Sequence, residues 1–243
     1  MMRRVTSRRG AQLVVVALCA AAVKLYYSTA SVNQLRWILA PTTLLVELVS
    51  GSRFEFESHA GYINGDRTFI IAASCAGVNF LITAFLMLSL RKLWGGRSQG
   101  AAWKFIPCAA LCAYLATLVA NTVRISTALR LHGTRVETGW LSQNQLHRFE
   151  GIFIYFGFLL LLFMVSEKMS SKNASSSENA SGLFRRLFCP LLFYYATTLG
   201  IPMANGAYRQ GADFWEHSLF VLLTPLLLIL PLTTFRLYRD HRA

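Results

Sequence analysis

Long apolar runs separated by short polar segments form the main pattern along the chain. Spanning a bilayer takes a helix of about 20 mostly apolar residues, and the runs of suitable length cover 11–28, 69–90, 105–124, 149–166, 186–204 and 217–235. A seventh run, 37–49, is shorter and contains Pro41 and Glu47. Only 14% of the residues are charged and 54% are hydrophobic, which is typical of a membrane protein. The pattern predicts an all-α fold, a polytopic membrane helix bundle of about six transmembrane helices plus one short interfacial or re-entrant segment.

Basic residues lie mainly between the apolar runs, and their placement predicts which side of the membrane each polar segment faces. The formal net charge is +13, but there is no single basic face and no aromatic-basic motif, which argues against nucleic-acid binding. Lys and Arg are enriched in cytoplasmic segments, and the N-terminal tail and the segment 91–104 contain basic residues and no acid. We therefore expect both termini and the linker 167–185 to be cytoplasmic. The segments 52–66, 125–147 and 206–216 should lie outside, which requires that 37–49 does not cross.

Two further sequence features predict how the chain is organised. The basic N-terminal tail followed by an apolar run is similar to a signal peptide, and because more apolar runs follow, we expect an uncleaved signal anchor. The segment 167–185 is rich in Ser and Asn and low in complexity, which is typical of a flexible linker. It predicts a division into a four-span membrane core, 1–166, and a two-span C-terminal hairpin, 186–243.

Three residues capable of catalytic chemistry are expected at the outer side of the membrane. Cys75, in the stretch "SCAGVNFL", would lie about 9 Å below the outer end of its apolar run if that run is helical. Arg124 ends its run near the outer boundary, and His147 stands at the mouth of the next one. Helical Cβ atoms lean toward the helix N-terminus, so Cys75 would lean outward and Arg124 inward. The two side chains should therefore converge at one depth.

Two neighbours strengthen this group, and each member also has a structural alternative. Asn121 precedes Arg124 by three residues and so shares its helix face, where its amide could hold the guanidinium. Glu150 follows His147 by three residues and could orient the imidazole, or simply face water. Alternatively, Cys75 is a small packing residue, Arg124 snorkels to the headgroups, and His147 is an interfacial polar residue. The joint occurrence on three spans favours a functional site.

The five cysteines give no sign of a disulfide framework or a metal site. None forms a CxxC pair, and their number is odd, which excludes complete pairing. All of them lie in or beside apolar runs, where thiols often act as small hydrophobic residues. They are Cys19, Cys75, Cys108, Cys112 and Cys189. No metal and no cofactor is expected.

Three short motifs in order resemble the exosortase/archaeosortase family of membrane cysteine transpeptidases. They are "SCAGVNFL", with Cys75 followed by Gly77; "NTVRIS", with Asn121 and Arg124; and "HRFEGIFIYF", with His147. The resemblance covers about residues 1–166 and implies a compact exosortase-like core. The C-terminal hairpin lies beyond it. Other histidines also stand in or beside outer segments, but His147 is preferred because a glycine and aromatics follow it; the others are His59, His132 and His217.

The resemblance implies a bacterial or archaeal cytoplasmic (inner) membrane location with the active site on the outer face. It implies cleavage of C-terminal sorting tails of exported proteins, each with a short motif, an apolar helix and a basic cluster. Cys75 would form a thioester, Arg124 would stabilise the thiolate or the oxyanion, and His147 would be the general acid and base. The acyl group would pass to an acceptor, possible partners being a lipid or a glycan.

Two other functions remain open from the residues alone. An intramembrane hydrolase would use the same nucleophile with water as the final acceptor. A small polytopic membrane transporter or envelope assembly factor without catalysis would use Arg124 and Asn121 for an anionic ligand and would not need Cys75.

Overall fold

The computed structural model describes residues 2–95, 100–134, 143–170 and 180–240, and most of them are helical. Six helices among the described residues are long and apolar enough to cross a membrane. They are Arg9–Thr29, Ala73–Trp94, Trp103–His132, Gln145–Met169, Leu187–Ala204 and Phe214–Pro231. Each overlaps one of the predicted apolar runs. The prediction of an all-α polytopic bundle is confirmed, and the chain is a multi-pass membrane protein.

The chain divides into two compact units, Met1–Arg135 and Val136–Ala243. The first contains α1 (Met2–Thr29), α2 (Arg36–Ser50), α3 (Val78–Gly95) and α4 (Gly100–Thr134), and a small sheet between α2 and α3. The second contains α5 to α8. The two units are defined by the contacts within each of them, and their boundary differs from that between the predicted core, 1–166, and the predicted hairpin, 186–243. The division into a catalytic core and a hairpin stays a prediction.

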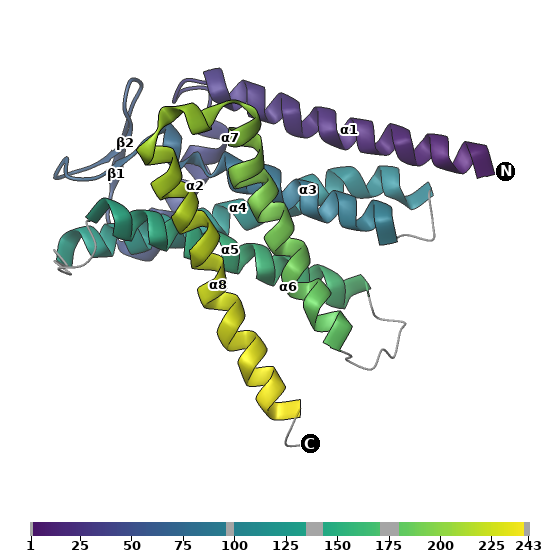
Figure 1. Ribbon diagram of the computed structural model, residues 1–243. Coiled ribbons are helices and arrows are strands. Elements are labelled where there is room, and N and C mark those ends of the chain that lie inside the picture. The colour runs from purple at the N-terminus through teal and green to yellow at the C-terminus, as the bar shows by residue number, and fades with distance from the viewer. Residues whose placement is uncertain (1, 96–99, 135–142, 171–179, 241–243) are drawn as a thin grey trace. The chain divides into compact units, whose positions relative to one another are not determined.

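In the first unit, α1 and α4 pack against α3, and the three helices run side by side (Figure 1). The start of α1, the end of α3 and the start of α4 lie at one end of this unit, and the sheet lies at the other. Small residues on α3 and α4, including Ala84, Ala113 and Ala120, are fully buried. Such residues let membrane helices approach closely.

The short run around residues 37–49 forms α2, a 15-residue helix of about 22 Å, outside the six candidate spans. Its buried face, which includes Ile38, Thr42 and Val46, packs against α4. Pro41 has no amide hydrogen to donate to the Trp37 carbonyl one turn earlier. The Tyr114 hydroxyl of α4 donates to that carbonyl instead, at 2.8 Å. The proline is therefore compatible with the helix because a neighbouring helix satisfies the freed acceptor.

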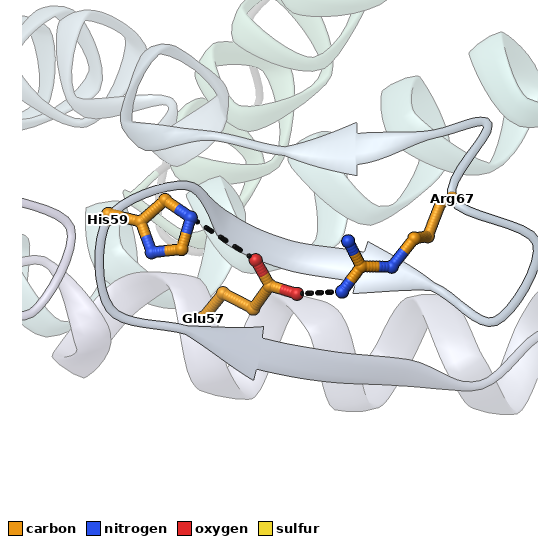
Figure 2. A network of polar contacts seen from close by, with 3 residues as sticks. All are labelled: Glu57, His59 and Arg67. Carbon is orange, nitrogen blue, oxygen red and sulfur yellow. Dashed lines mark hydrogen bonds and ion pairs between the residues drawn. The ribbon is translucent and has the colours of Figure 1, made fainter.

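A three-stranded antiparallel sheet follows α2, where the sequence predicted only an outer segment. Its order is β1-β2-β3, and the strands are β1 (Phe54–Glu57), β2 (Gly61–Asn64) and β3 (Ile70–Ile71). Figure 2 shows the Glu57 carboxylate between two side chains: it lies 3.3 Å from His59 Nε2 and 2.5 Å from Arg67 Nη2. These contacts tie the end of β1 to the two turns of the sheet.

One glycine is essential to the pairing of β2 with β3. Gly61 has a positive φ of 127°, and a Cβ placed on it would stand 2.3 Å from the Ile71 carbonyl oxygen. Real Cβ atoms do not approach a backbone carbonyl so closely, and most other residues resist this backbone conformation. Gly61 therefore allows β2 to lie against the chain just before the Cys75 segment.

In the second unit, α5 (Gln143–Ser170) packs against α6 (Ala180–Tyr195) and α8 (Ala212–Asp240). A π-helical segment, Ala196–Gly200, and the short helix α7 (Ile201–Ala204) continue the direction of α6 before the chain returns (Figure 1). The predicted linker 167–185 is shorter than expected, because α5 extends to Ser170 and α6 begins at Ala180. Its central part, 171–179, lies outside the described residues.

Candidate functional site

Cys75 lies on a short turn before α3, and not within the α-helix that the sequence predicted. The 3-10 helix η1 spans Ala73–Ala76, and the Cys75 amide donates to the Ala72 carbonyl at 2.9 Å. Gly77 then adopts a left-handed conformation with φ 70°, and α3 begins at Val78. Because glycine tolerates positive φ and ends helical turns readily, Gly77 separates the cysteine turn from the helix. The outward lean expected of a helical Cys75 therefore does not apply.

Asn121 of α4 connects the Cys75 turn to Arg124. Its side chain is fully buried. Asn121 Nδ2 donates to the Cys75 carbonyl oxygen at 2.5 Å, and Arg124 Nε donates to Asn121 Oδ1 at 3.3 Å. Burying an amide costs free energy unless its polar atoms are bonded, and here both ends are bonded. One side chain thus links the main chain that carries the thiol to a guanidinium.

The sequence predicted that the helix ends near Arg124, but the helix continues well beyond this residue. Although the apolar run fades after residue 124, Ile125 and Ala128 continue the buried face, and α4 extends to Thr134. Arg124 is half-buried and is bonded to a fully buried amide. This arrangement weakens the alternative in which the arginine only reaches out to headgroups.

Two residues of α1 extend the polar group around Cys75 and were missed by the sequence analysis. Lys24 Nζ donates to Asn79 Oδ1 at 2.8 Å and lies 5.7 Å from the centroid of the Tyr27 ring. Asn79 stands on the first turn of α3. Tyr27 lies within electrostatic range of both Cys75 and Arg124. The signal was available, because an ionisable residue inside an apolar run marks a functional position by default.

His147 and Glu150 lie together on the first turns of α5, in the second unit. His147 Nδ1 is 3.5 Å from Glu150 Oε2; the imidazole is half-exposed, whereas the carboxylate is 8% exposed. Neither Glu150 oxygen has a hydrogen bond among the described residues. The two side chains are therefore adjacent without a hydrogen bond between them, and orientation of the imidazole by Glu150 stays a prediction. Nearby, Gln145 donates to Glu216 Oε1 of α8 at 3.1 Å.

The structure groups the expected residues into two sets. Cys75, Asn121 and Arg124 are joined by hydrogen bonds within the first unit, and His147 contacts Glu150 within the second. The assignment of His147 to the same site as Cys75 stays a prediction.

Two of the three alternative histidines contact another side chain in the part of the chain that the structure describes. His59 is 80% exposed, and its Nε2 lies 3.3 Å from Glu57 Oε2. The His132 ring meets the Phe69 ring edge-on, with 6.2 Å between centroids. His217 is half-buried on α8. His59 and His132 therefore make contacts in or beside the sheet.

The arrangement joins the main chain of Cys75 and the guanidinium of Arg124 to the same buried amide. Within the described residues, no cluster of three or more His, Cys, Asp or Glu side chains could hold a metal ion. The chain matches no protein-family model, no curated protein and no solved structure. The resemblance to exosortases therefore depends on the three motifs alone, two of which the structure joins through Asn121.

Proposed function

We propose that the chain is a membrane cysteine transpeptidase or protease that cleaves C-terminal sorting tails of exported proteins through a thioester at Cys75. One observation carries this proposal: a buried amide bonds the Cys75 main chain and the Arg124 guanidinium at the same time. A packing cysteine needs no such support. A thiol-based acyl transferase does, because its nucleophile and the group that stabilises charge must keep a fixed separation.

The proposed reaction has two steps. The Cys75 thiolate attacks the scissile carbonyl, and a carbon–sulfur bond forms while negative charge develops on the carbonyl oxygen. Arg124 stabilises that charge or the thiolate itself. The carbon–nitrogen bond then breaks, and the leaving amine takes the proton that His147 has removed from the thiol. An acceptor amine or hydroxyl, or water, next attacks the thioester, the carbon–sulfur bond breaks, and a proton from the acceptor passes through His147 to the sulfur.

The proposed orientation places the Cys75 turn and the sheet on the outer face of the cytoplasmic membrane. The start of α1, the end of α3 and the start of α4, which carry basic residues, lie at one end of the first unit, and the sheet lies at the other. Basic segments favour the cytoplasm, which supports this direction. Reporter fusions at Gly61 should indicate the outside, and fusions after Gly95 should indicate the cytoplasm. A cytoplasmic signal at Gly61 would reverse the orientation and remove the proposed substrate.

The decisive experiment replaces the nucleophile. The chain is co-expressed with exported proteins that carry an apolar C-terminal helix and a basic tail, and their new C-termini are determined by mass spectrometry. Cys75→Ser and Cys75→Ala should both leave the substrate uncut, because a hydroxyl ionises far less readily than a thiol and a methyl group cannot ionise. Wild-type processing by Cys75→Ala at matched expression would refute the proposal.

The other four cysteines provide the matched control, since replacing Cys19, Cys108, Cys112 and Cys189 together with Ala should retain processing. A hydroxylamine-sensitive adduct on Cys75 would identify the thioester. A substrate product that carries an attached lipid or glycan indicates transpeptidation, whereas a free carboxyl terminus indicates hydrolysis.

A further inference from the structure

Strand β3 is an outer strand of the sheet and leads directly into the Cys75 turn. The order β1-β2-β3 leaves one side of β3 without a strand partner. After Ile71 comes Ala72, whose backbone is extended with φ −84° and ψ 177°, and η1 begins at the next residue. The open edge therefore ends one short turn before the proposed nucleophile.

The register determines which main-chain groups face the open edge. In an antiparallel pair, residues alternate between hydrogen-bonded and non-hydrogen-bonded positions. The Asn64 amide donates to the Phe69 carbonyl at 3.1 Å, so this is a hydrogen-bonded position. The next pair, Ile63 with Ile70, is then non-hydrogen-bonded, and the N–H and C=O of Ile70 point away from β2. The same alternation turns the N–H of Ala72 outward.

These outward groups remain open to a ligand in the part of the chain that the structure describes. No described residue bonds the Ile70 amide or carbonyl across this edge, or the Ala72 amide, and the Ile70 residue is 46% exposed. The Ala72 carbonyl is different, because the Cys75 amide occupies it. The edge thus offers two donors and one acceptor in the spacing of a strand.

The two outer strands of the sheet differ in how they are protected. Proteins commonly protect exposed strand edges with charged residues. Strand β1 carries Glu55 and Glu57, and the amide of Phe54 at its start is bonded to Glu47 of α2 at 2.7 Å. Strand β3 consists of two isoleucines and has no charge. The edge of β1, which is remote from Cys75 in the chain, is therefore protected by charge, whereas the edge of β3, which leads to Cys75, is not.

We propose that the open edge of β3 binds the substrate as an added strand, through main-chain hydrogen bonds to Ile70 and Ala72, and presents the scissile bond to Cys75. This inference rests on the proposed function. The occupant is an extended polypeptide segment, because only such a segment supplies donors and acceptors at strand spacing. Main-chain pairing gives affinity, and side chains at every second substrate position contact the protein.

The test uses the full-length chain in detergent with Cys75 as its only thiol and two alkylating probes. One is acetyl-tetra-alanyl chloromethyl ketone, which can pair as a strand, and the other is iodoacetamide, which cannot. Ala72→Pro removes the outward N–H, while φ −84° is close to the value that proline imposes. We expect the rate for the peptidyl probe to fall about tenfold, as for one lost hydrogen bond, and the iodoacetamide rate to change less than about twofold.

Ala73→Pro is the matched control. It places a proline at the first position of the turn, where helices tolerate proline, and the extended Ala72 before it suits a following proline. Both probes should react with Ala73→Pro at rates close to those of the parent. An equal peptidyl rate in Ala72→Pro and its parent would overturn the strand-addition proposal.

A second measurement keeps the test decisive if Ala72→Pro slows both probes together. Single N-methylation of the peptidyl probe, applied to the parent chain whose only thiol is Cys75, should slow alkylation when alternate amides are methylated and leave the rate nearly unchanged when the intervening amides are methylated. Equal effects at all amides would exclude strand pairing. If Cys75→Ala still processes sorting tails, the proposed function itself fails. If Cys75 is essential but the methylation pattern does not alternate, only the strand-addition inference fails.

Discussion

Replacing Asn121 with alanine should release the Cys75 turn from α4. The substitution removes the bond to the Cys75 carbonyl and the bond from Arg124. Hydrogen bonds between membrane helices contribute about 0.6 kcal/mol on average and up to about 1.7 kcal/mol. Only the bond to the Cys75 carbonyl joins two helical elements, and its loss together with that of the bond within α4 should lower the free energy of unfolding by about 1–2 kcal/mol. Equilibrium denaturation in mixed micelles measures this change.

Ser126→Ala is the control for this substitution. Ser126 is also buried on α4, but its hydroxyl has no hydrogen-bond partner among the described residues. Its removal should change the free energy of unfolding by less than about 0.5 kcal/mol. If Asn121→Ala and Ser126→Ala prove equally stable, the amide does not hold the turn and our reasoning is refuted.

Asn121→Asp distinguishes the hydrogen bond to the Cys75 carbonyl from the hydrogen bond with Arg124. Aspartate can still accept the bond from Arg124, but its carboxylate cannot donate to the Cys75 carbonyl and also offsets the positive charge of the guanidinium. Alkylation of Cys75 by iodoacetamide should therefore slow about fivefold, which corresponds to about 1 kcal/mol. An unchanged rate would mean that Arg124 does not act on the thiol.

Three further predictions concern the sheet, the cation and the histidine. Gly61→Ala should destabilise the first unit by about 2 kcal/mol or more, because strain and a backbone clash combine, whereas Gly65→Ala, with nothing within 4 Å of its Cβ, should be nearly neutral in thermal denaturation. Arg124→Lys keeps the charge but loses the planar fork, so processing should fall at least tenfold with normal abundance on immunoblots; full activity would leave only an anchoring role. His147→Ala should abolish processing and His217→Ala should retain most of it, and the opposite result would reassign the base.

The membrane helices could be predicted from the sequence. The three-stranded sheet and the turn that carries Cys75 were not predicted. A long apolar run identifies a membrane helix without reference to any partner. The strands have only two to four residues, too few for periodicity to distinguish them from a loop. Local signs existed in the alternating "FEFE" of β1 and in the Asn64-Gly65 pair, a common hairpin signal.

The site depends on a contact that no local pattern encodes. Asn121 and Cys75 are 46 residues apart, and their hydrogen bond follows from the packing of α4 near η1. The apolar composition of residues 69–90 is equally compatible with a helix and with a short strand followed by a turn. Gly77 was the one residue that indicated a break before α3. Sequence reasoning therefore grouped Cys75, Asn121 and Arg124, which the structure joins by hydrogen bonds, and misjudged the backbone that carries Cys75.

The length of α4 has a consequence for how the protein responds to its bilayer. The helix has 35 residues and is about 52 Å long, whereas a typical hydrocarbon layer is about 30 Å thick. Such a helix spans thin and thick membranes alike and adjusts by tilting. Since α4 bonds the Cys75 turn and meets Phe69 beside the sheet, a change of tilt carries both with it. Lipid composition would then alter the depth of the Cys75 turn in the membrane, while the hydrogen bonds through Asn121 keep the turn joined to Arg124.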